Sequence, residues 1–102
     1  MSEPVIVFSS KIGEFEAIPN NGLRVVREYD YYFYGKKRSR FTLAEIKSFD
    51  ARVTIQESGE GGSTNSIPIK FFESFDSAQK AEHELMNLVK SDPQSLQLIR
   101  VL

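Results

Sequence analysis

Apolar and polar side chains alternate along most of this chain, a period of two that is typical of extended strands. The clearest example is the segment 49–56, in which Phe49, Ala51, Val53 and Ile55 alternate with polar residues. The same pattern in shorter form predicts further strands at 5–9, 13–18, 23–28, 29–34, 38–42 and 67–72. So many short strands in 102 residues predict a fold that is mainly β-sheet.

Breaks between these segments indicate antiparallel hairpins. The clearest break is the sequence PNNG, in which Asn21 and Gly22 tolerate the positive φ angles that tight turns require. We expect the next reversal at 35–37 and a longer, glycine-rich polar loop at 57–66. A short segment, LAEI at 43–46, follows the strand at 38–42 and leads to the strand at 49–56.

The period of the apolar residues changes after residue 76 and indicates one amphipathic helix. Either Asp76 or Ser77 would cap its N-terminus, and the sequence SDP at 91–93 would end it. The tail 92–102 fits both a strand and a helical turn, so its conformation stays open. The apolar residues that share one face of this helix are Ala78, Ala81, Leu85, Leu88 and Val89.

These patterns predict a single domain, residues 1–102, of the α+β class with mostly β structure. We expect an antiparallel bent sheet or half-barrel of six to seven strands, capped by one C-terminal amphipathic helix. The helix needs an apolar surface to cover, and a twisted sheet provides one. The residues expected in the core are Phe15, Val25, Phe41, Ile46, Val53, Ile55, Ile69, Phe71, Leu85 and Leu88.

The residue types that carry most enzyme chemistry are nearly absent. The chain has no cysteine and a single histidine, His83, which excludes disulfides, thiolate metal sites and cysteine–histidine pairs. Glu14 and Glu16 share a strand face, but a solvated sheet face explains this pair better than a cation site does. We therefore expect a non-enzymatic protein with no catalytic residues, no metal and no cofactor.

The net charge of −1 means that any binding to nucleic acid or to an anionic membrane must come from a local patch. The apolar run near the N-terminus, Val5 to Phe8, is too short for a signal peptide or a membrane span. We therefore expect a cytoplasmic protein. An anionic lipid headgroup is the least favoured ligand, because no lipid or amphipathic anchor accompanies the basic residues.

The strongest candidate for a binding site is the run YDYYFYGKKRSRF at 29–41. Alternate rings point to opposite faces of a strand, so one set would join the core and leave Tyr32 and Tyr34 outside. Two exposed rings can stack bases or anchor a partner protein, and nearby cations suit phosphates or acidic side chains. The same residues also suit a purely structural hairpin, since tyrosine favours strands and lysine protects turns. The predicted surface comprises Tyr32, Tyr34, Lys36, Lys37, Arg38 and Arg40, with Arg24 and Arg27 as a secondary patch.

Two resemblances suggest what such a surface would bind. The segments RFTLAEIKSFDARVTI and IPIKFFESFDSAQKAEHELMNLV resemble the later strands and the closing helix of small bacterial pleckstrin-homology-like domains. That resemblance implies an open, bent half-barrel closed by the helix. Because the chain is rich in strands and aromatic residues and lacks a catalytic set, we expect a small interaction module of this fold that binds a protein partner or itself. The segment RVTIQESGEGGSTNSIPIKFF is similar to the strand–loop–strand of PUR-type repeats, which implies single-stranded nucleic acid as the alternative ligand.

Overall fold

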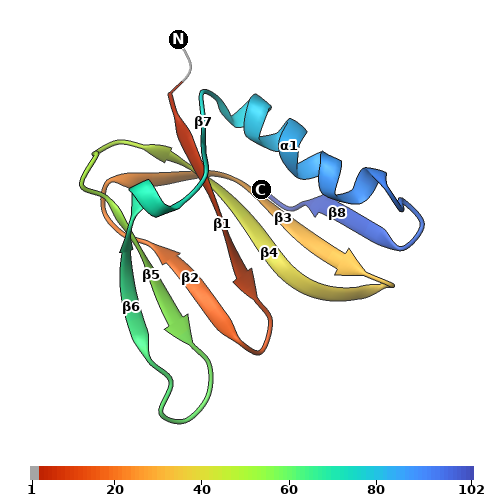
Figure 1. Ribbon diagram of the computed structural model, residues 1–102, viewed down its shortest axis with the longest axis horizontal. Coiled ribbons are helices and arrows are strands. Elements are labelled where there is room, and N and C mark those ends of the chain that lie inside the picture. The colour runs from red at the N-terminus through yellow and green to blue at the C-terminus, as the bar shows by residue number, and fades with distance from the viewer. Residues whose placement is uncertain (1–2) are drawn as a thin grey trace.

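Strands from the whole chain join into one antiparallel sheet, and a single α-helix lies on it (Figure 1). The computed structural model describes residues 3–102. The elements are β1 (Val5–Lys11), β2 (Phe15–Pro19), β3 (Leu23–Phe33), β4 (Lys36–Ile46), β5 (Arg52–Glu57), β6 (Thr64–Pro68), the 3-10 helix η1 (Ile69–Phe71), β7 (Ser74–Phe75), α1 (Ala78–Lys90) and β8 (Leu96–Arg100). The strand order is β6-β5-β2-β1-β4-β3-β8, with β7 paired to β1. The predicted class is confirmed, although the open sheet has eight strands rather than six or seven.

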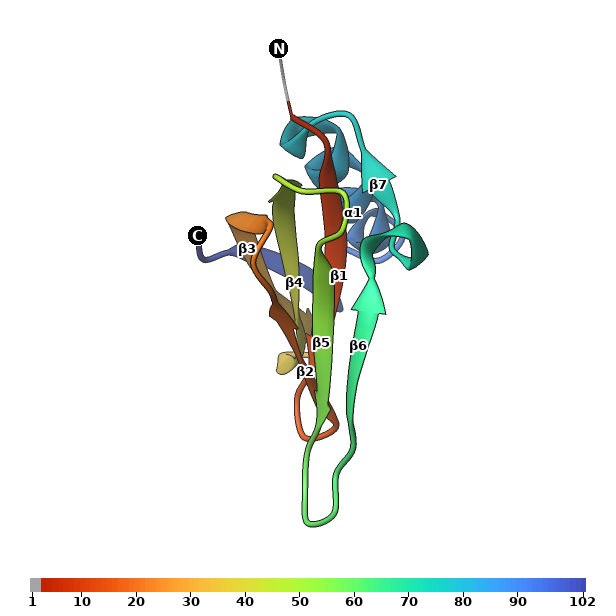
Figure 2. The same ribbon diagram turned by 90° about the vertical axis from the view of Figure 1, so that its left-hand side faces the viewer.

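The sheet bends where β2 leaves β1. β1 pairs with β4 along its whole length, from Val5↔Glu45 to Lys11↔Ser39, but it meets β2 only at Lys11↔Phe15. β2, β5 and β6 therefore diverge as one arm, while β3, β4 and β8 form another (Figure 1). Seen from the side the molecule is flat (Figure 2), and its shortest dimension is 20 Å, which corresponds to two layers.

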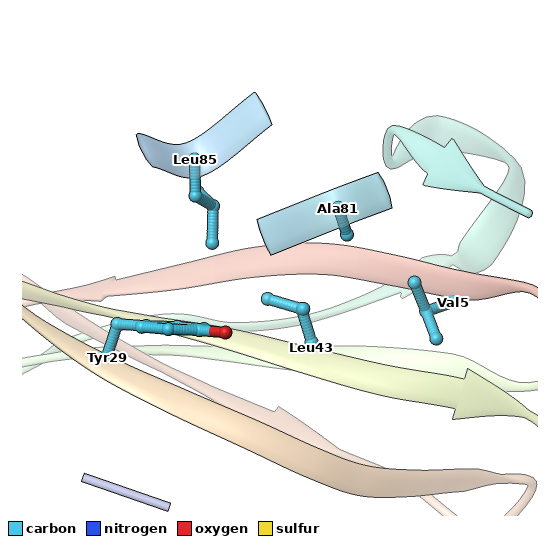
Figure 3. Packing of buried hydrophobic residues seen from close by; sticks show 5 residues of the cluster. All are labelled: Val5, Tyr29, Leu43, Ala81 and Leu85. Carbon is cyan, nitrogen blue, oxygen red and sulfur yellow. The ribbon is translucent and has the colours of Figure 1, made fainter. Parts of the chain in front are cut away.

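Both faces of β1 are covered, which explains the uninterrupted apolar run VIVF at its start. On one face, Val5 packs with Tyr29 and Leu43 of the sheet and with Ala81 and Leu85 of α1 (Figure 3). This cluster lies between the helix and strands β1, β3 and β4. The helix therefore covers a face of the sheet.

A second cluster fills the opposite face of β1 and β4, inside the bend of the sheet. Its buried members are Ile6, Phe8, Ala17, Ala44 and Val53. Successive side chains of a strand point to opposite faces, so β1 and β4 contribute to both clusters. The bent sheet is thus held by α1 on one side and by β2 and β5 on the other.

α1 begins after Ser77, whose hydroxyl accepts a hydrogen bond from the Lys80 N–H at 3.2 Å. Ser77 is therefore the N-cap, while the Asp76 carboxylate accepts a hydrogen bond from the Lys80 ammonium. The tail that the sequence left open forms β8 and pairs with β3. Within residues 3–102, no helix combines the length and the apolar character that crossing a membrane requires.

Three predicted boundaries are wrong. The strand predicted at 49–56 begins only at Arg52, where its partner β6 becomes available. The strand predicted at 67–72 ends at Pro68 and turns into η1, because proline offers no N–H to continue the ladder. The strand predicted at 38–42 is longer, because β4 runs from Lys36 to Ile46 and includes the segment 43–46.

Two residues predicted in the core, Phe71 and Leu88, are exposed, by 71% and 48%. The turn of η1 directs Phe72 inward instead, where its ring meets the edge of Phe8 with centroids 6.3 Å apart. Leu88 lies on a part of α1 that the sheet leaves uncovered. Of the other predicted core residues, those buried are Val53 and Leu85, and those half-buried are Phe15, Val25, Phe41, Ile46, Ile55 and Ile69.

Candidate interaction surface

The turn between β3 and β4 consists of Tyr34 and Gly35. Both have positive φ angles, 50° and 76°, as in the type I′ turn that matches the twist of a hairpin. Phe33 and Lys36 face each other as the last pair of the two strands. The reversal therefore lies one residue earlier than the predicted 35–37, and Lys36 already belongs to β4.

This turn separates the two tyrosines that the sequence predicts on one face. Tyr32 is half-buried on β3 opposite Lys37, whereas Tyr34 lies in the turn with 67% of its surface exposed. The Tyr34 ring packs against Phe33, with centroids 4.5 Å apart and planes at 82°. The prediction that Tyr32 and Tyr34 share one face of a strand is wrong, because the chain reverses before Tyr34 can take a strand position.

A cation accompanies the aromatic pair at this turn. The Arg38 guanidinium lies 5.9 Å from the centre of the Phe33 ring, within the range of a cation–π contact. Arg38 is the extra residue of a bulge opposite Tyr31 and Tyr32. Neither Lys36 nor Arg38 takes part in an ion pair within residues 3–102. We call the following residues the tip patch: Phe33, Tyr34, Lys36 and Arg38.

The other predicted cations of the hairpin are bound to acids. The Arg40 guanidinium lies 2.9 Å from Asp30 and 3.3 Å from Glu28, and the Lys37 ammonium lies 3.3 Å from Asp30. Burial of the Asp30 carboxyl would by itself raise its pKa, but hydrogen bonds from Arg40 and Lys37 outweigh burial and hold that pKa below its usual value. Lys37 and Arg40 therefore belong to an internal charge network rather than to the tip patch.

The secondary patch lies toward the opposite end of β3. At about 3.3 Å per residue, Arg24 is roughly 30 Å from Phe33 along the strand. Arg24 pairs with Glu45 of β4 at 3.2 Å, and Arg27 pairs with Glu82 of α1 at 3.2 Å. These two arginines connect β3 to its neighbours and do not extend the tip patch.

β8 leaves an edge of the sheet open beside the tip patch. Ser95 and Val101, which flank β8, form hydrogen bonds on the β3 side at 2.7 and 2.8 Å. Because such pairs alternate along an antiparallel ladder, the backbone groups of Leu98 and Arg100 are directed to the open edge. The Leu96 N–H instead donates a hydrogen bond to the Asp92 carbonyl at 2.9 Å. Sequence reasoning missed this edge because the tail fitted two conformations. The apolar side chains exposed near it are Ile99, Val101 and Leu102.

The acidic side chains and the histidine are dispersed. Among residues 3–102, no three His, Cys, Asp or Glu side chains lie close enough together to hold a metal ion. Glu14, considered above with Glu16, pairs with Lys11 at 2.9 Å, and His83 is exposed on α1. What the hairpin and β8 bring together is aromatic rings, cations and backbone hydrogen-bonding groups, which are the groups of a binding surface.

The structure therefore divides the predicted surface. It keeps Tyr34, Lys36 and Arg38 together, adds Phe33, and leaves Tyr32 on the strand beside the charge network. Comparison of the chain with protein-family models, with curated proteins and with solved structures gave no match. A function must accordingly be inferred from the described surface itself.

Proposed function

We propose that this chain is a non-enzymatic interaction module that binds a protein partner or a second copy of itself through the tip patch and the open edge of β8. The observation that carries the proposal is the exposure of Phe33 and Tyr34 at a tight turn beside an unpaired strand edge. Aromatic residues and arginine are enriched at protein interfaces, and an open edge accepts a further strand.

The charge distribution favours a protein over nucleic acid as the ligand. Affinity for a phosphate backbone grows with the number of phosphates that free cations can neutralise. In the described part of the chain, Lys36 and Arg38 remain free at the hairpin, too few for a groove that follows a strand of nucleic acid. The predicted cations already paired with acids are Arg24, Arg27, Lys37 and Arg40.

The fold that we associate with this function is a pleckstrin-homology-like half-barrel, as the sequence resemblance implies. A sheet that bends around one apolar cluster and carries a single helix late in the chain supports this assignment. β8, which follows α1, is an addition that the resemblance does not imply.

The variant Tyr34→Asn tests the proposal, because asparagine suits the positive φ of this turn and the hairpin is retained while the ring is lost. Sedimentation of the wild type over a range of concentrations should detect self-association, and Tyr34→Asn should weaken it by at least about tenfold. Ile18→Thr, which changes an exposed strand residue on the other arm, should have no effect.

Nucleic-acid binding is tested in parallel with single-stranded oligonucleotides at low salt. The proposal predicts no binding. If instead the wild type remained monomeric and bound oligonucleotides, and if this binding fell with salt and disappeared in Lys36→Gln with Arg38→Gln, nucleic acid would replace protein as the ligand.

A further inference from the structure

An apolar hollow of about 310 Å³ lies between α1, β1, β4 and β7. We call it the α1 groove. Its apolar lining residues are Val7, Phe41, Phe75, Ala81, Leu85 and Leu88, and its charged ones are Glu73 and Glu84. A hollow of this size with a mainly apolar lining accommodates large side chains of a partner.

The apolar stripe of α1 extends beyond the sheet that covers it. Ala81 and Leu85 point onto the sheet and are buried (Figure 3). Leu88 lies almost one turn further on the same stripe and is half exposed. A partner side chain that covered Leu88 would remove this apolar area from water and so stabilise the complex.

The rim of the α1 groove is negatively charged. Glu73 and Glu84 take part in no ion pair within residues 3–102, whereas Glu82 on the same helix is held by Arg27 and Tyr29. Two free carboxylates beside an apolar floor repel phosphate groups. They favour a partner that presents an apolar side chain flanked by cations.

The tip patch has this complementary chemistry. It presents the rings of Phe33 and Tyr34 beside the unpaired cations of Lys36 and Arg38, at the narrow end of a hairpin. The tip cannot reach the groove of its own chain, because β4 holds Lys36 roughly 17 Å away from the groove residue Phe41. A second copy of the chain can supply it.

We propose that the tip patch of one copy binds in the α1 groove of another, with Tyr34 as the apolar anchor and Arg38 and Lys36 facing Glu73 and Glu84. This inference rests on the proposed function and specifies the surface that receives the tip. The contact joins two different surfaces, so every copy offers one tip and one groove. Association therefore continues into rings or filaments rather than ending at a two-fold dimer.

Two charge-reversed variants test this contact. Arg38→Glu alters the tip and leaves the groove intact, and Glu84→Arg alters the groove and leaves the tip intact. Both residues are exposed, so both variants should fold. Each variant alone should associate at least about tenfold more weakly than the wild type, because like charges then face each other. An equimolar mixture should regain association in alternating copies, since every contact in it again joins opposite charges.

The results distinguish this inference from the function on which it rests. If Arg38→Glu weakened association but Glu84→Arg did not, and mixing restored nothing, the groove would not be the receiving surface and the inference would be overturned. It would also be overturned if Ile99→Lys alone weakened association, because the copies would then pair through the β8 edge. In the first case the proposed function would stand, because the tip patch would still mediate association. In the second case the β8 edge alone would be the interface, and the tip patch would be removed from the proposed function. A monomeric wild type that bound oligonucleotides would overturn both the inference and the proposed function.

Discussion

The hydroxyl of Tyr29 in β3 donates a hydrogen bond of 2.6 Å to the carboxylate of Glu82 in α1. Arg27 pairs with the second oxygen of the same carboxylate at 3.2 Å. The Tyr29 ring is fully buried between the sheet and the helix, so this hydroxyl is a polar link inside an apolar contact. The link fixes α1 over β3 and thereby sets the position of the α1 groove.

Replacing Tyr29 by phenylalanine removes this hydrogen bond and keeps the ring. We expect Tyr29→Phe to lower the free energy of unfolding by about 1 kcal/mol, measured by chemical denaturation. The matched control is Tyr31→Phe, since Tyr31 packs edge-on against Phe41 through its ring, with centroids 6.1 Å apart. Equal losses in the two variants would contradict a specific role of the Tyr29 hydroxyl.

The Tyr29 hydroxyl should also make the fold less stable at alkaline pH. Burial raises the pKa of the Tyr29 hydroxyl, and its hydrogen bond to Glu82 raises it further. The resulting stabilisation is complete below the pKa of an unfolded tyrosine, about 10, and is lost as pH rises through the folded pKa. Chemical denaturation at increasing pH should show that the free energy of unfolding declines, and the decline with pH should be less steep in Tyr29→Phe than in the wild type. Identical slopes would rule out Tyr29 as its source.

The Asp30 network should make the fold sensitive to acid. The Asp30 pKa is lowered in the folded state. The contribution of Asp30 to the free energy of unfolding is therefore present above the unfolded pKa of about 3.9, and it is lost as pH falls through the folded pKa. Asp30→Asn should cost about 1–3 kcal/mol at neutral pH, since Arg40 and Lys37 lose a buried partner. The melting temperature of Asp30→Asn should then fall less on acidification than the melting temperature of the wild type. Glu60→Gln serves as the control, since Glu60 is an exposed acid that takes part in no ion pair within residues 3–102.

The two turn residues of the β3–β4 hairpin should respond in opposite directions. Gly35 has φ +76° and no atom within 4 Å of an added Cβ, so Gly35→Ala carries only a conformational cost of about 1 kcal/mol. Tyr34→Asn should leave stability unchanged or raise it by about 0.5 kcal/mol, since asparagine tolerates φ 50° better. Thermal melts compare the two, and a large loss in Tyr34→Asn would mean that the ring supports the fold.

The adjacent phenylalanines at the end of η1 should differ sharply. Phe72 packs on Phe8 in the second cluster, so Phe72→Ala should cost roughly 2 kcal/mol. Phe71 is mostly exposed, its ring 5.3 Å from the Lys70 ammonium, so Phe71→Ala should change stability by less than about 0.5 kcal/mol. Denaturant titrations of the two variants measure these losses. A larger loss in Phe71→Ala than in Phe72→Ala would contradict this assignment and place Phe71 in the core.

Local sequence patterns predicted where the helix and most strands lie, but they predicted less well the residues at which these elements begin and end. The helix and its choice of caps followed from apolar spacing and from two residues, Asp76 and Ser77, while the geometry of the cap selected Ser77. The alternation at 49–56 continues past the point where a partner strand exists, which is why Phe49 is predicted inside a strand and is 91% exposed. An alternation of side chains carries no information on where the neighbouring strand ends.

The binding surface was predicted only in part, for a similar reason. Tyr34, Lys36 and Arg38 are close in sequence, and the structure keeps them together at the hairpin. Arg40 is just as close in sequence but is engaged by Asp30 on the adjacent strand. The α1 groove had no sequence signature, because its walls come from segments that are distant along the chain.

The amino-acid sequence by itself determined that this chain is mostly β with one amphipathic helix, because the period of the side chains reflects local backbone geometry. Only the tertiary structure decided that Tyr29 is buried while Tyr34 is exposed, and that the tail forms β8. Those outcomes depend on which strands become neighbours. Neighbours are selected by the burial of apolar surface between distant segments, which no local pattern contains.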